Sequence, residues 1–412
     1  MNTQHRTRAT LIAAAAAALL LSGCTPQPAL DIGTDAGAPS ASAEHGAATS
    51  RLALSYDGGI LVLDGPTLQL EADLPFDGFT RLNAAGDGRH VLVTTTEGFR
   101  VLDTGTWTDK EGDHHLGEPE LTDLLFEADA AGHVVRHGEK TILFADGTGD
   151  TTIFESASLL QAGDSLPATE TIPSEEAHHG VAIELDNGTL LSTTGNSSGR
   201  TGIRVLDASR TEIDRNEQCP SVHGEGAAAN EVAVFGCADG VLVYDDGAIT
   251  KIASPDEYGR TGNQYVSETS TVAVGDYNSD PDAEGYLLNK LLLVDTESKT
   301  SSVVELPAGV SYTWRDVARG PNDEILVLSS DGALYVLDEQ TGAITATHPV
   351  IAAWEGPVEW QDAHPALLVN AGVAYVTEPA SNSVHAVDIE TGAILNSVQL
   401  PATPNEIAIV TG

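Results

Sequence analysis

Short apolar segments that end in an acidic residue recur along the chain. Seven of them read ILVLD (60–64), FRVLD (99–103), IRVLD (203–207), VLVYD (241–245), LLLVD (291–295), LYVLD (334–338) and VHAVD (384–388), and a weaker copy reads TTIFE (151–155). Their mean spacing is about 46 residues, which is typical of propeller blades rather than of helical solenoids. The flanking segments also read as short strands separated by Gly, Asn and Asp turns. Eight copies therefore predict an all-β, eight-bladed β-propeller.

The last apolar segment has no acid-ended partner of its own. It reads NEIAIVTG at 405–412, whereas the first blade begins at RLALSYD, 51–57. We expect residues near 404–411 to supply the innermost strand of the first blade, because this pairing joins the two chain ends and removes an exposed sheet edge.

The N-terminus has the pattern of a bacterial lipoprotein signal. Arg6 and Arg8 precede an apolar run from Ala9 to Leu21, and LSGC at 21–24 matches a lipobox. We expect a signal peptide at 1–23, lipidation of Cys24, a flexible Pro/Gly/Ser-rich tether at 24–50 and the propeller domain at 51–412. The protein would then be exported and anchored at the outer leaflet of the cytoplasmic membrane, on the cell surface or in the periplasm. The alternative is an ordinary cleaved signal with a chance cysteine.

Lipidation of Cys24 would leave Cys219 and Cys237 as the only cysteine pair. An exported protein occupies a compartment that permits disulfides, so we expect these two to be bonded. In the chain-entropy model such a bridge stabilises the fold by about 3 kcal/mol. A thiolate metal site is the rival interpretation.

The chain is strongly acidic, with 61 Asp and Glu against 19 Lys and Arg and a formal net charge of −42. Such a surface repels phosphate, which excludes nucleic acid as a partner, and it attracts cations in a diffuse way.

Five of the thirteen histidines share one position in the repeat. His133 and His223 each lie 22 residues before the terminal acid of their unit, and His364 lies 24 before. His178 and His179 lie 29 and 28 residues before Asp207, displaced by the insertion TGNSSGRTG. Equivalent positions on neighbouring blades converge around one axis, so these side chains are expected at one mouth of the central channel. Arg81 and Trp314 have the same phase in other units.

Imidazole nitrogens together with a carboxylate form the ligand set of an accessible zinc site, and three protein ligands would leave one position open for exchange. Glu225 lies two residues after His223, and His114 and His115 lie in the loop EGDHHLGEPE, which could reach the same face. One of the adjacent pair His178 and His179 would bind the metal, while the other faces a neighbouring blade or supports a ligand. The predicted zinc ligands are His178, His179, His223, His114, His133, His364 and Glu225. Any one of these histidines taken alone is more often an ordinary surface or capped residue.

Three motifs resemble the AztD-type zinc metallochaperones: AHHGVAIEL (177–185), CPSVHGEGAA (219–228) and FGCADGVLVY (235–244). The similarity extends from about residue 50 to the end and includes GDHH (112–115) and GHVVRHGEKTILFADGTGD (132–150). The resemblance implies an exported β-propeller that passes zinc to the solute-binding protein of a zinc ABC importer. We also expect a monomer, and no enzyme, since the sequence has no adjacent cysteine pair and no nucleophile elbow. Family members often carry a histidine-rich N-terminus, whereas this tail offers only Glu44 and His45.

Two other functions stay open on sequence alone. Propellers also host calcium-dependent enzymes of the lactonase or lyase type. The segment DYNSDPDAEG (276–285) has acids at 276, 280 and 282 like a calcium loop, but Pro281 and Leu287 stand where that pattern requires glycine and glutamate. The second alternative is a surface interaction module whose histidines bind no metal.

Overall fold

The computed structural model describes residues 50–109 and 112–412. The predicted signal peptide, Cys24 and all of the predicted tether except Ser50 lie outside these ranges. Within the described residues no helix is long and apolar enough to cross a membrane.

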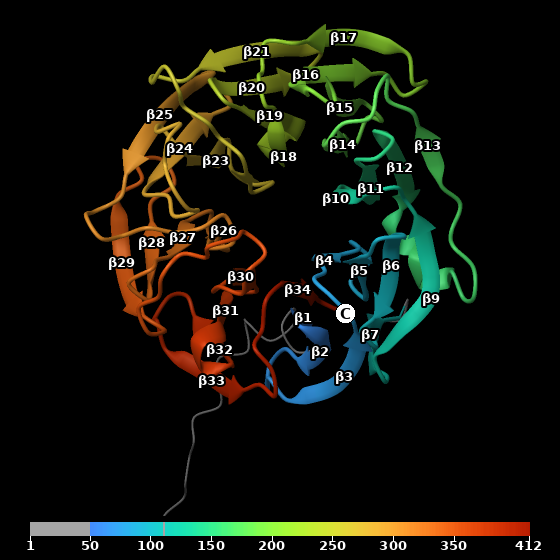
Figure 1. Cartoon of the computed structure of the whole chain (residues 1–412), viewed down its shortest axis with the longest axis vertical. Coiled ribbons are helices and arrows are strands. Elements are labelled where there is room, and N and C mark those ends of the chain that lie inside the picture. The colour runs from blue at the N-terminus through green and yellow to red at the C-terminus, as the bar shows by residue number, and fades with distance from the viewer. Residues whose placement is uncertain (1–49, 110–111) are drawn as a thin grey trace, which may run out of the picture. The chain divides into compact units, whose positions relative to one another are not determined.

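The described residues form eight four-stranded antiparallel sheets, which are the blades of a propeller (Figure 1). This arrangement confirms the predicted all-β, eight-bladed fold. Blades 1 to 4 consist of β34 (Ile407–Val410), β1 (Arg51–Tyr56), β2 (Gly58–Asp64) and β3 (Leu70–Phe76); β4 (Leu82–Ala84), β5 (His90–Thr94), β6 (Gly98–Asp103) and β9 (Glu120–Glu127); β10 (Ala131–His137), β11 (Lys140–Ala145), β12 (Asp150–Glu155) and β13 (Glu170–Ile172); and β14 (Ala182–Glu184), β15 (Leu190–Asn196), β16 (Gly199–Leu206) and β17 (Glu212–Asn216).

The second half of the ring repeats this plan. Blades 5 to 8 consist of β18 (His223–Ala228), β19 (Val232–Cys237), β20 (Gly240–Asp245) and β21 (Ala248–Ala253); β22 (Gln264–Tyr265), β23 (Val272–Tyr277), β24 (Lys290–Asp295) and β25 (Thr300–Glu305); β26 (Val317–Arg319), β27 (Ile325–Leu328), β28 (Ala333–Leu337) and β29 (Ile344–Pro349); and β30 (Leu367–Asn370), β31 (Val373–Glu378), β32 (Ser383–Asp388) and β33 (Ile394–Gln399). In each blade the first strand named is the innermost one (Figure 1).

The ring is closed by the end of the chain. β34 pairs with β1 in antiparallel register, with Arg51 opposite Val410 and Leu54 opposite Ile407. The expected closure by residues near 404–411 is therefore confirmed, and the first blade combines strands from both ends of the described chain.

The repeated acid of the sequence closes a turn. In blade 1, Asp64 ends the buried strand β2, and its Oδ1 accepts hydrogen bonds from the backbone N and the Oγ1 of Thr67 at 2.9 and 2.5 Å. The same bonds join Asp338 to Thr341 in blade 7 and Asp388 to Thr391 in blade 8. An acid at this position starts the turn that returns the chain along the outermost strand, which explains why it recurs.

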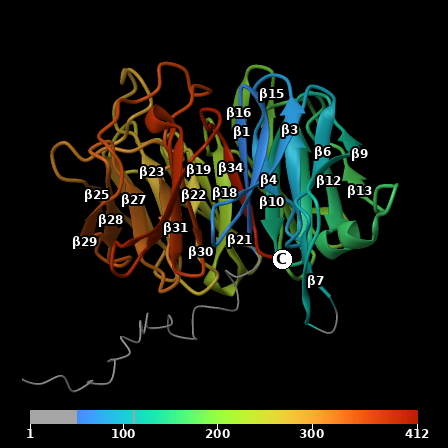
Figure 2. The ribbon, with the colours of Figure 1, turned by 90° about the horizontal axis from the view of Figure 1, so that it is seen from below.

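The remaining elements lie outside the blades. They are the two-stranded sheet β7 (Thr106–Thr108) and β8 (His114–Leu116), and the 3₁₀ turns η1 (Ser156–Gln161), η2 (Ala229–Glu231) and η3 (Pro379–Ser381). The β7–β8 hairpin projects beyond the blades on the side where the C-terminus lies (Figure 2).

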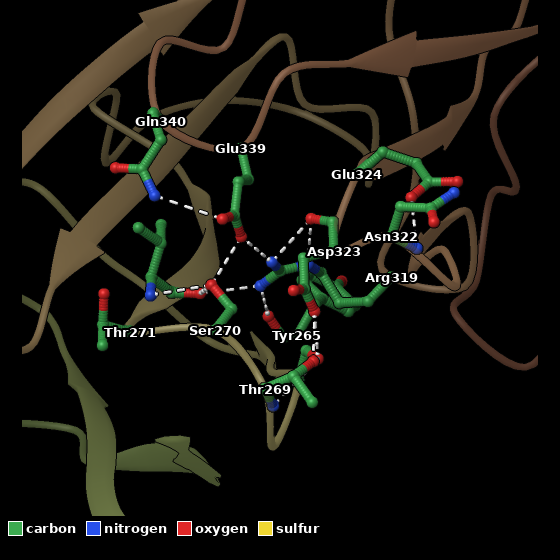
Figure 3. A network of polar contacts seen from close by, with 12 residues as sticks. Tyr265, Thr269, Ser270, Thr271, Arg319, Asn322, Asp323, Glu324, Glu339 and Gln340 are labelled. Carbon is green, nitrogen blue, oxygen red and sulfur yellow. Dashed lines mark hydrogen bonds and ion pairs between the residues drawn. The ribbon is translucent and has the colours of Figure 1, made fainter. Parts of the chain in front are cut away.

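A polar network joins blades 6 and 7 (Figure 3). Arg319, at the end of β26, donates to the carbonyl oxygen of Val272 and that of Asp323, each at 2.7 Å, and to Glu339 Oε2 at 2.5 Å. Ser270 Oγ donates to the same Glu339 oxygen at 2.5 Å. The guanidinium thus ties together two blades whose apolar strands supply the core.

Candidate metal centre

Three histidines from three consecutive blades meet at the central channel. His133 lies on β10 of blade 3, His179 precedes β14 of blade 4, and His223 begins β18 of blade 5. One ring nitrogen of each lies within 4.8 Å of the others. The ring centroids are 4.9 Å apart for His133 and His179, 5.3 Å for His133 and His223, and 5.2 Å for His179 and His223. We refer to these three side chains as the histidine cluster.

Hydrogen bonds at the far side of two rings fix which nitrogen can bind a metal. His223 Nδ1 lies 2.5 Å from the carbonyl oxygen of Gly262, which can only accept, so Nδ1 carries the proton. His179 Nδ1 likewise faces Asp146 Oδ2 at 2.6 Å. Nε2 is therefore the nitrogen that each ring can offer to a metal, and the two Nε2 atoms face each other at 3.1 Å. Two nitrogens bound to one tetrahedral zinc stand about 3.3 Å apart, given Zn–N bonds of about 2.05 Å.

Burial keeps two of the rings uncharged. It lowers the pKa of His223 to about 3, an effect that the Gly262 carbonyl partly offsets and that the neighbouring His179, Arg260 and Arg200 reinforce. Burial also lowers the pKa of His133 well below its ordinary value, followed by the effects of His223, His179 and Arg81. His133 Nδ1 is buried without a hydrogen-bond partner in the described part of the chain. Neutral imidazoles with an unsatisfied nitrogen suit a metal cation.

Two glycines allow the supporting contacts. Gly224 has φ +68°, and a Cβ there would lie 2.4 Å from the Gly262 oxygen that accepts the His223 proton. A Cβ at Gly132 would lie 2.3 Å from Oδ1 of Asp146, the carboxylate that holds His179. Any larger residue would displace a partner of the cluster.

The disulfide fixes the strand that carries His223. Cys219 and Cys237 are bonded, with their Cα atoms 4.9 Å apart, as the sequence predicted. The bridge joins the segment before β18 to the end of β19, and both cysteines are fully buried. It therefore fixes the backbone four residues before His223.

Glu225 lies near the cluster but outside it. The register of β18 against β19 shifts between His223 and Glu225, so the simple alternation that would put both side chains on one face does not hold here. Glu225 lines the same cavity as the three histidines, and burial raises its pKa to about 8. This shift favours the uncharged form of the carboxyl group.

His178 and His364 are buried apart from the cluster. His178 Nδ1 lies 2.9 Å from the Glu176 oxygen and its Nε2 lies 3.1 Å from Thr193, so it packs inside blade 4 while its neighbour His179 faces the channel. His364 Nδ1 bonds to the Asp362 oxygen at 2.7 Å, and burial lowers the pKa of His364 to about 4, reinforced by Arg315. His178 and His364, both predicted as zinc ligands, are therefore interior residues that do not belong to the histidine cluster.

His114 lies on the β7–β8 hairpin, with Nδ1 2.7 Å from Thr108 Oγ1. Its neighbour His115 bonds to Asp109 at 2.7 Å and stacks on Trp107. The hairpin projects on the C-terminal side (Figure 2). Every innermost strand follows the outermost strand of the preceding blade, so all innermost strands run in the same direction. β10 therefore runs, like β34, toward the C-terminal side of the ring. His133 lies near the start of β10 and hence toward the opposite side. The structure does not bring His114 to the cluster.

A second group of ligand-type side chains joins the same three blades at the other end of β10. His137, Asp186 and Glu231 have ligand atoms within 4.8 Å of one another. Here His137 Nε2 already lies 3.0 Å from both Glu231 oxygens, and Glu231 accepts the Asp186 backbone N–H at 2.8 Å. His137 and Glu231 are therefore already hydrogen-bonded to partners within this group, whereas His133 Nδ1 in the histidine cluster has no partner among the described residues.

The acids of the calcium-like segment do not form a comparable group. Asp276 is buried and accepts hydrogen bonds from the backbone of Gly262 and Asn263, while Asp280 and Asp282 lie in an exposed turn.

The histidine cluster opens into a cavity of about 810 Å³ along the central channel. Arg81 and Trp314, which share the histidines' repeat phase, also line it. Sequence reasoning assigned no role to Asp146 and Gly262, the oxygens that orient two of the rings. Asp146 directly follows β11, the strand that pairs with the His133 strand β10. An acidic residue at that position was the available signal. The Gly262 carbonyl gave none, because any residue supplies one.

No protein-family model and no curated protein matches the chain. Among solved structures, apo AztD from Citrobacter koseri is similar with a TM-score of 0.73 and 20% identity, over 88% of this chain and 97% of that chain. A second crystal structure of Citrobacter koseri AztD has the same TM-score and identity over 88% and 98%. The dihydro-heme d1 dehydrogenase NirN is similar with a TM-score of 0.55 and 12% identity, over 90% and 82%. At these identities the likeness is one of fold, and at that level it confirms the resemblance to AztD that the sequence motifs indicated.

Proposed function

We propose that this protein binds zinc at His133, His179 and His223 and passes it to the solute-binding protein of a zinc ABC importer. The observation that carries the proposal is the pair of facing Nε2 atoms, 3.1 Å apart, on rings whose Nδ1 atoms both face oxygen acceptors. A cation bound between these two atoms would take a lone pair from each Nε2, while the Nδ1 contacts hold both rings in place.

The ligand set favours transfer over structural storage. Three imidazoles leave the fourth zinc position open, so an incoming ligand from a partner can bind before the first ligands leave. His179 is 41% exposed, which gives such a ligand access to the metal. The fold also stands without zinc ligation, since eight apolar blades and a disulfide hold it together.

The setting agrees with such a role. The AztD-like fold and the sequence motifs point to the same family of exported metallochaperones. An exported lipoprotein anchored through Cys24 would hold its cargo beside an importer, and the acidic surface would concentrate cations around it. We expect the protein to act as a monomer and without an enzymatic activity of its own.

Competition with a chromogenic zinc chelator tests the binding step, using the full chain without a histidine tag. We expect one zinc per chain bound more tightly than by the chelator. Wild-type affinity in a folded His179→Ala/His223→Ala variant would contradict the assignment.

Transfer is tested separately. Zinc-loaded protein is mixed with the metal-free solute-binding protein of a zinc importer from the same organism, and the rate is compared with release into the chelator. Transfer faster than release supports direct handover through a shared ligand. Transfer limited by the release rate would contradict it and leave only a zinc-binding propeller.

The rival functions predict different metal contents. A calcium-dependent propeller enzyme would retain calcium, whereas a surface interaction module would bind neither metal. The separation of Asp276 from the exposed Asp280 and Asp282 turn argues against the first, and the unsatisfied histidine cluster argues against the second.

A further inference from the structure

The lining of the cavity beside the histidine cluster is rich in basic residues, in contrast to the acidic protein as a whole. The whole chain has a formal charge of −42. Its cavity lining nevertheless contains four arginines and two glutamates, namely Arg81, Arg136, Arg260, Arg315, Glu225 and Glu406. Even with both glutamates ionised, the lining has an excess of two positive charges. In an acidic protein with 19 basic residues among Lys and Arg, this concentration of guanidinium groups requires an explanation.

Internal ion pairs use only part of this charge. Arg315 Nη2 bonds to Glu406 Oε1 at 2.5 Å, and Arg81 Nε lies 3.9 Å from the other oxygen of the same glutamate. Arg136 and Arg260 have no acidic partner within ion-pair distance among residues 50–109 and 112–412. The Arg260 guanidinium donates to the carbonyl oxygen of Ser221, at 3.3 Å. Two guanidinium groups therefore remain available to an anion.

The cavity also has flat apolar walls. The guanidinium carbons of Arg81 and Arg315 lie over the Trp314 ring, at 4.9 and 5.0 Å from its centroid, and Trp360 also lines the cavity. The volume of about 810 Å³ lies within the range of small-molecule sites. The two stacked guanidinium groups are those that share Glu406, so Arg136 and Arg260 are the ones left to bind a carboxylate.

The position of Arg260 links this cavity to the histidine cluster. Its guanidinium contacts Ser221, two residues before His223. A zinc ion held by three neutral imidazoles keeps both positive charges, so nearby guanidinium groups disfavour it unless an anion arrives with it. A carboxylate would offset the positive charge of both the zinc and the guanidinium groups, since it bonds to arginine and is a common oxygen ligand of zinc.

We propose that the arginine-lined cavity binds a carboxylate group, whose oxygen takes the open position of zinc at the histidine cluster. The carboxylate belongs either to a small organic acid or to an acidic side chain that a partner inserts into the channel. The part of the proposal that concerns zinc rests on the proposed function, whereas carboxylate binding by the arginines does not.

The first experiment uses the metal-free full chain and follows tryptophan fluorescence, to which Trp314 and Trp360 contribute from the cavity wall. Succinate is the probe, and the uncharged succinamide of nearly the same shape is its control. We expect succinate alone to change the fluorescence, with an affinity that falls about tenfold in Arg260→Gln and in Arg136→Gln. Arg100→Gln, on the outer strand pair of blade 2, should bind succinate like the wild type. Equal responses to the two probes, or unchanged affinity in both cavity variants, would overturn the proposal.

The second experiment measures zinc affinity in the same variants. Without succinate, Arg260→Gln should bind zinc as well as the wild type or more tightly, because a positive charge near the metal is lost. With succinate, wild-type zinc affinity should rise and that of Arg260→Gln should rise less. Weaker zinc binding by Arg260→Gln without succinate would instead mean that the arginine only supports the fold of the cluster, which contradicts the proposal.

The two sources of the carboxylate are separated by a short peptide containing glutamate, compared with its glutamine version. Tighter binding of the glutamate peptide than of succinate identifies a partner side chain, and the reverse identifies a small acid. Binding of neither contradicts the proposal. Failure of the proposed function would look different, since zinc would not bind while succinate still bound the metal-free protein.

Discussion

Two of the polar contacts between neighbouring blades are built on opposite principles. Between blades 6 and 7, Arg319 donates to two carbonyl oxygens and to Glu339, so donors and acceptors match (Figure 3). Across blades 3 to 5, three imidazoles face one another, and His133 Nδ1 finds no partner among the described residues. A matched network stabilises the interface by itself, whereas the histidine cluster costs free energy until a cation completes it.

The difference separates polar residues that hold the ring together from those that are kept for a ligand. Removing a member of the blade 6–7 network should reduce stability and leave zinc binding intact. Removing a member of the histidine cluster should weaken zinc binding and leave the stability of the metal-free protein intact. The following predictions test this contrast.

The largest effect is expected from His179→Ala/His223→Ala. Loss of two imidazole ligands should weaken zinc binding by about 1,000-fold or more, because the remaining His133 offers a single protein nitrogen. The unfolding temperature of the metal-free protein should stay close to the wild-type value, since the apolar blades and the disulfide hold the fold together. Chelator competition and calorimetry measure the two quantities.

The matched control is His114→Ala/His115→Ala, which removes another adjacent pair on the β7–β8 hairpin. Its zinc affinity should equal that of the wild type. A loss comparable to that of the cluster variant would show that the hairpin supplies ligands and that the three-histidine assignment is incomplete.

The disulfide is expected to have the next largest effect. Cys219→Ala/Cys237→Ala should lower the free energy of unfolding by about 3 kcal/mol, measured by denaturant titration. Zinc affinity should fall far less than in the double histidine variant, because β18 keeps its pairing with β19. Unchanged stability would mean that the neighbouring strands already fix this segment.

Arg319→Ala should lower the free energy of unfolding by about 2 to 3 kcal/mol. The side chains of Arg319 and Glu339 are only 5% and 20% exposed, so the substitution leaves a largely buried carboxylate without its partner. Restoring stability with the additional change Glu339→Gln would confirm that origin. Reduced zinc affinity in folded Arg319→Ala would break the contrast between the two regions.

The sequence predicted the fold more completely than the site. Acid-ended strands such as 60–64 and 334–338 repeat often enough to give the blade number, because each must bury its apolar residues and close a turn. Repeat phase also placed His133, His179 and His223 at one channel. It could not separate them from His364, since what surrounds a side chain depends on loops of other blades.

Local details of the backbone explain why the other predicted ligands do not lie in the histidine cluster. The register shift after His223 separated Glu225 from the cluster, although an extended strand would have aligned the two. The hairpin of His114 turned out to extend the blade on the C-terminal side. Asp146 and Gly262 approach the rings from neighbouring blades, and the repeat phase that grouped the histidines does not indicate these contacts.

Asp146→Ala should have the smallest of these effects. Loss of the carboxylate that holds His179 Nδ1 should weaken zinc binding by about 10- to 100-fold, as for other residues that orient metal-bound histidines. Asp146→Asn, whose amide oxygen can still accept a hydrogen bond from His179 Nδ1, should recover part of the affinity in the same chelator assay. Equal affinities of Asp146→Ala and the wild type would show that His179 needs no orientation.

X-ray absorption at the zinc edge tests the central claim most directly, using the untagged full chain loaded with one equivalent of zinc. The account predicts three imidazole nitrogens and one further light ligand at about 2.0–2.1 Å, with no sulfur. The multiple-scattering signal of imidazole should fall to that of one ring in His179→Ala/His223→Ala. A wild-type spectrum with fewer than two imidazoles, or with sulfur ligands, would contradict the account.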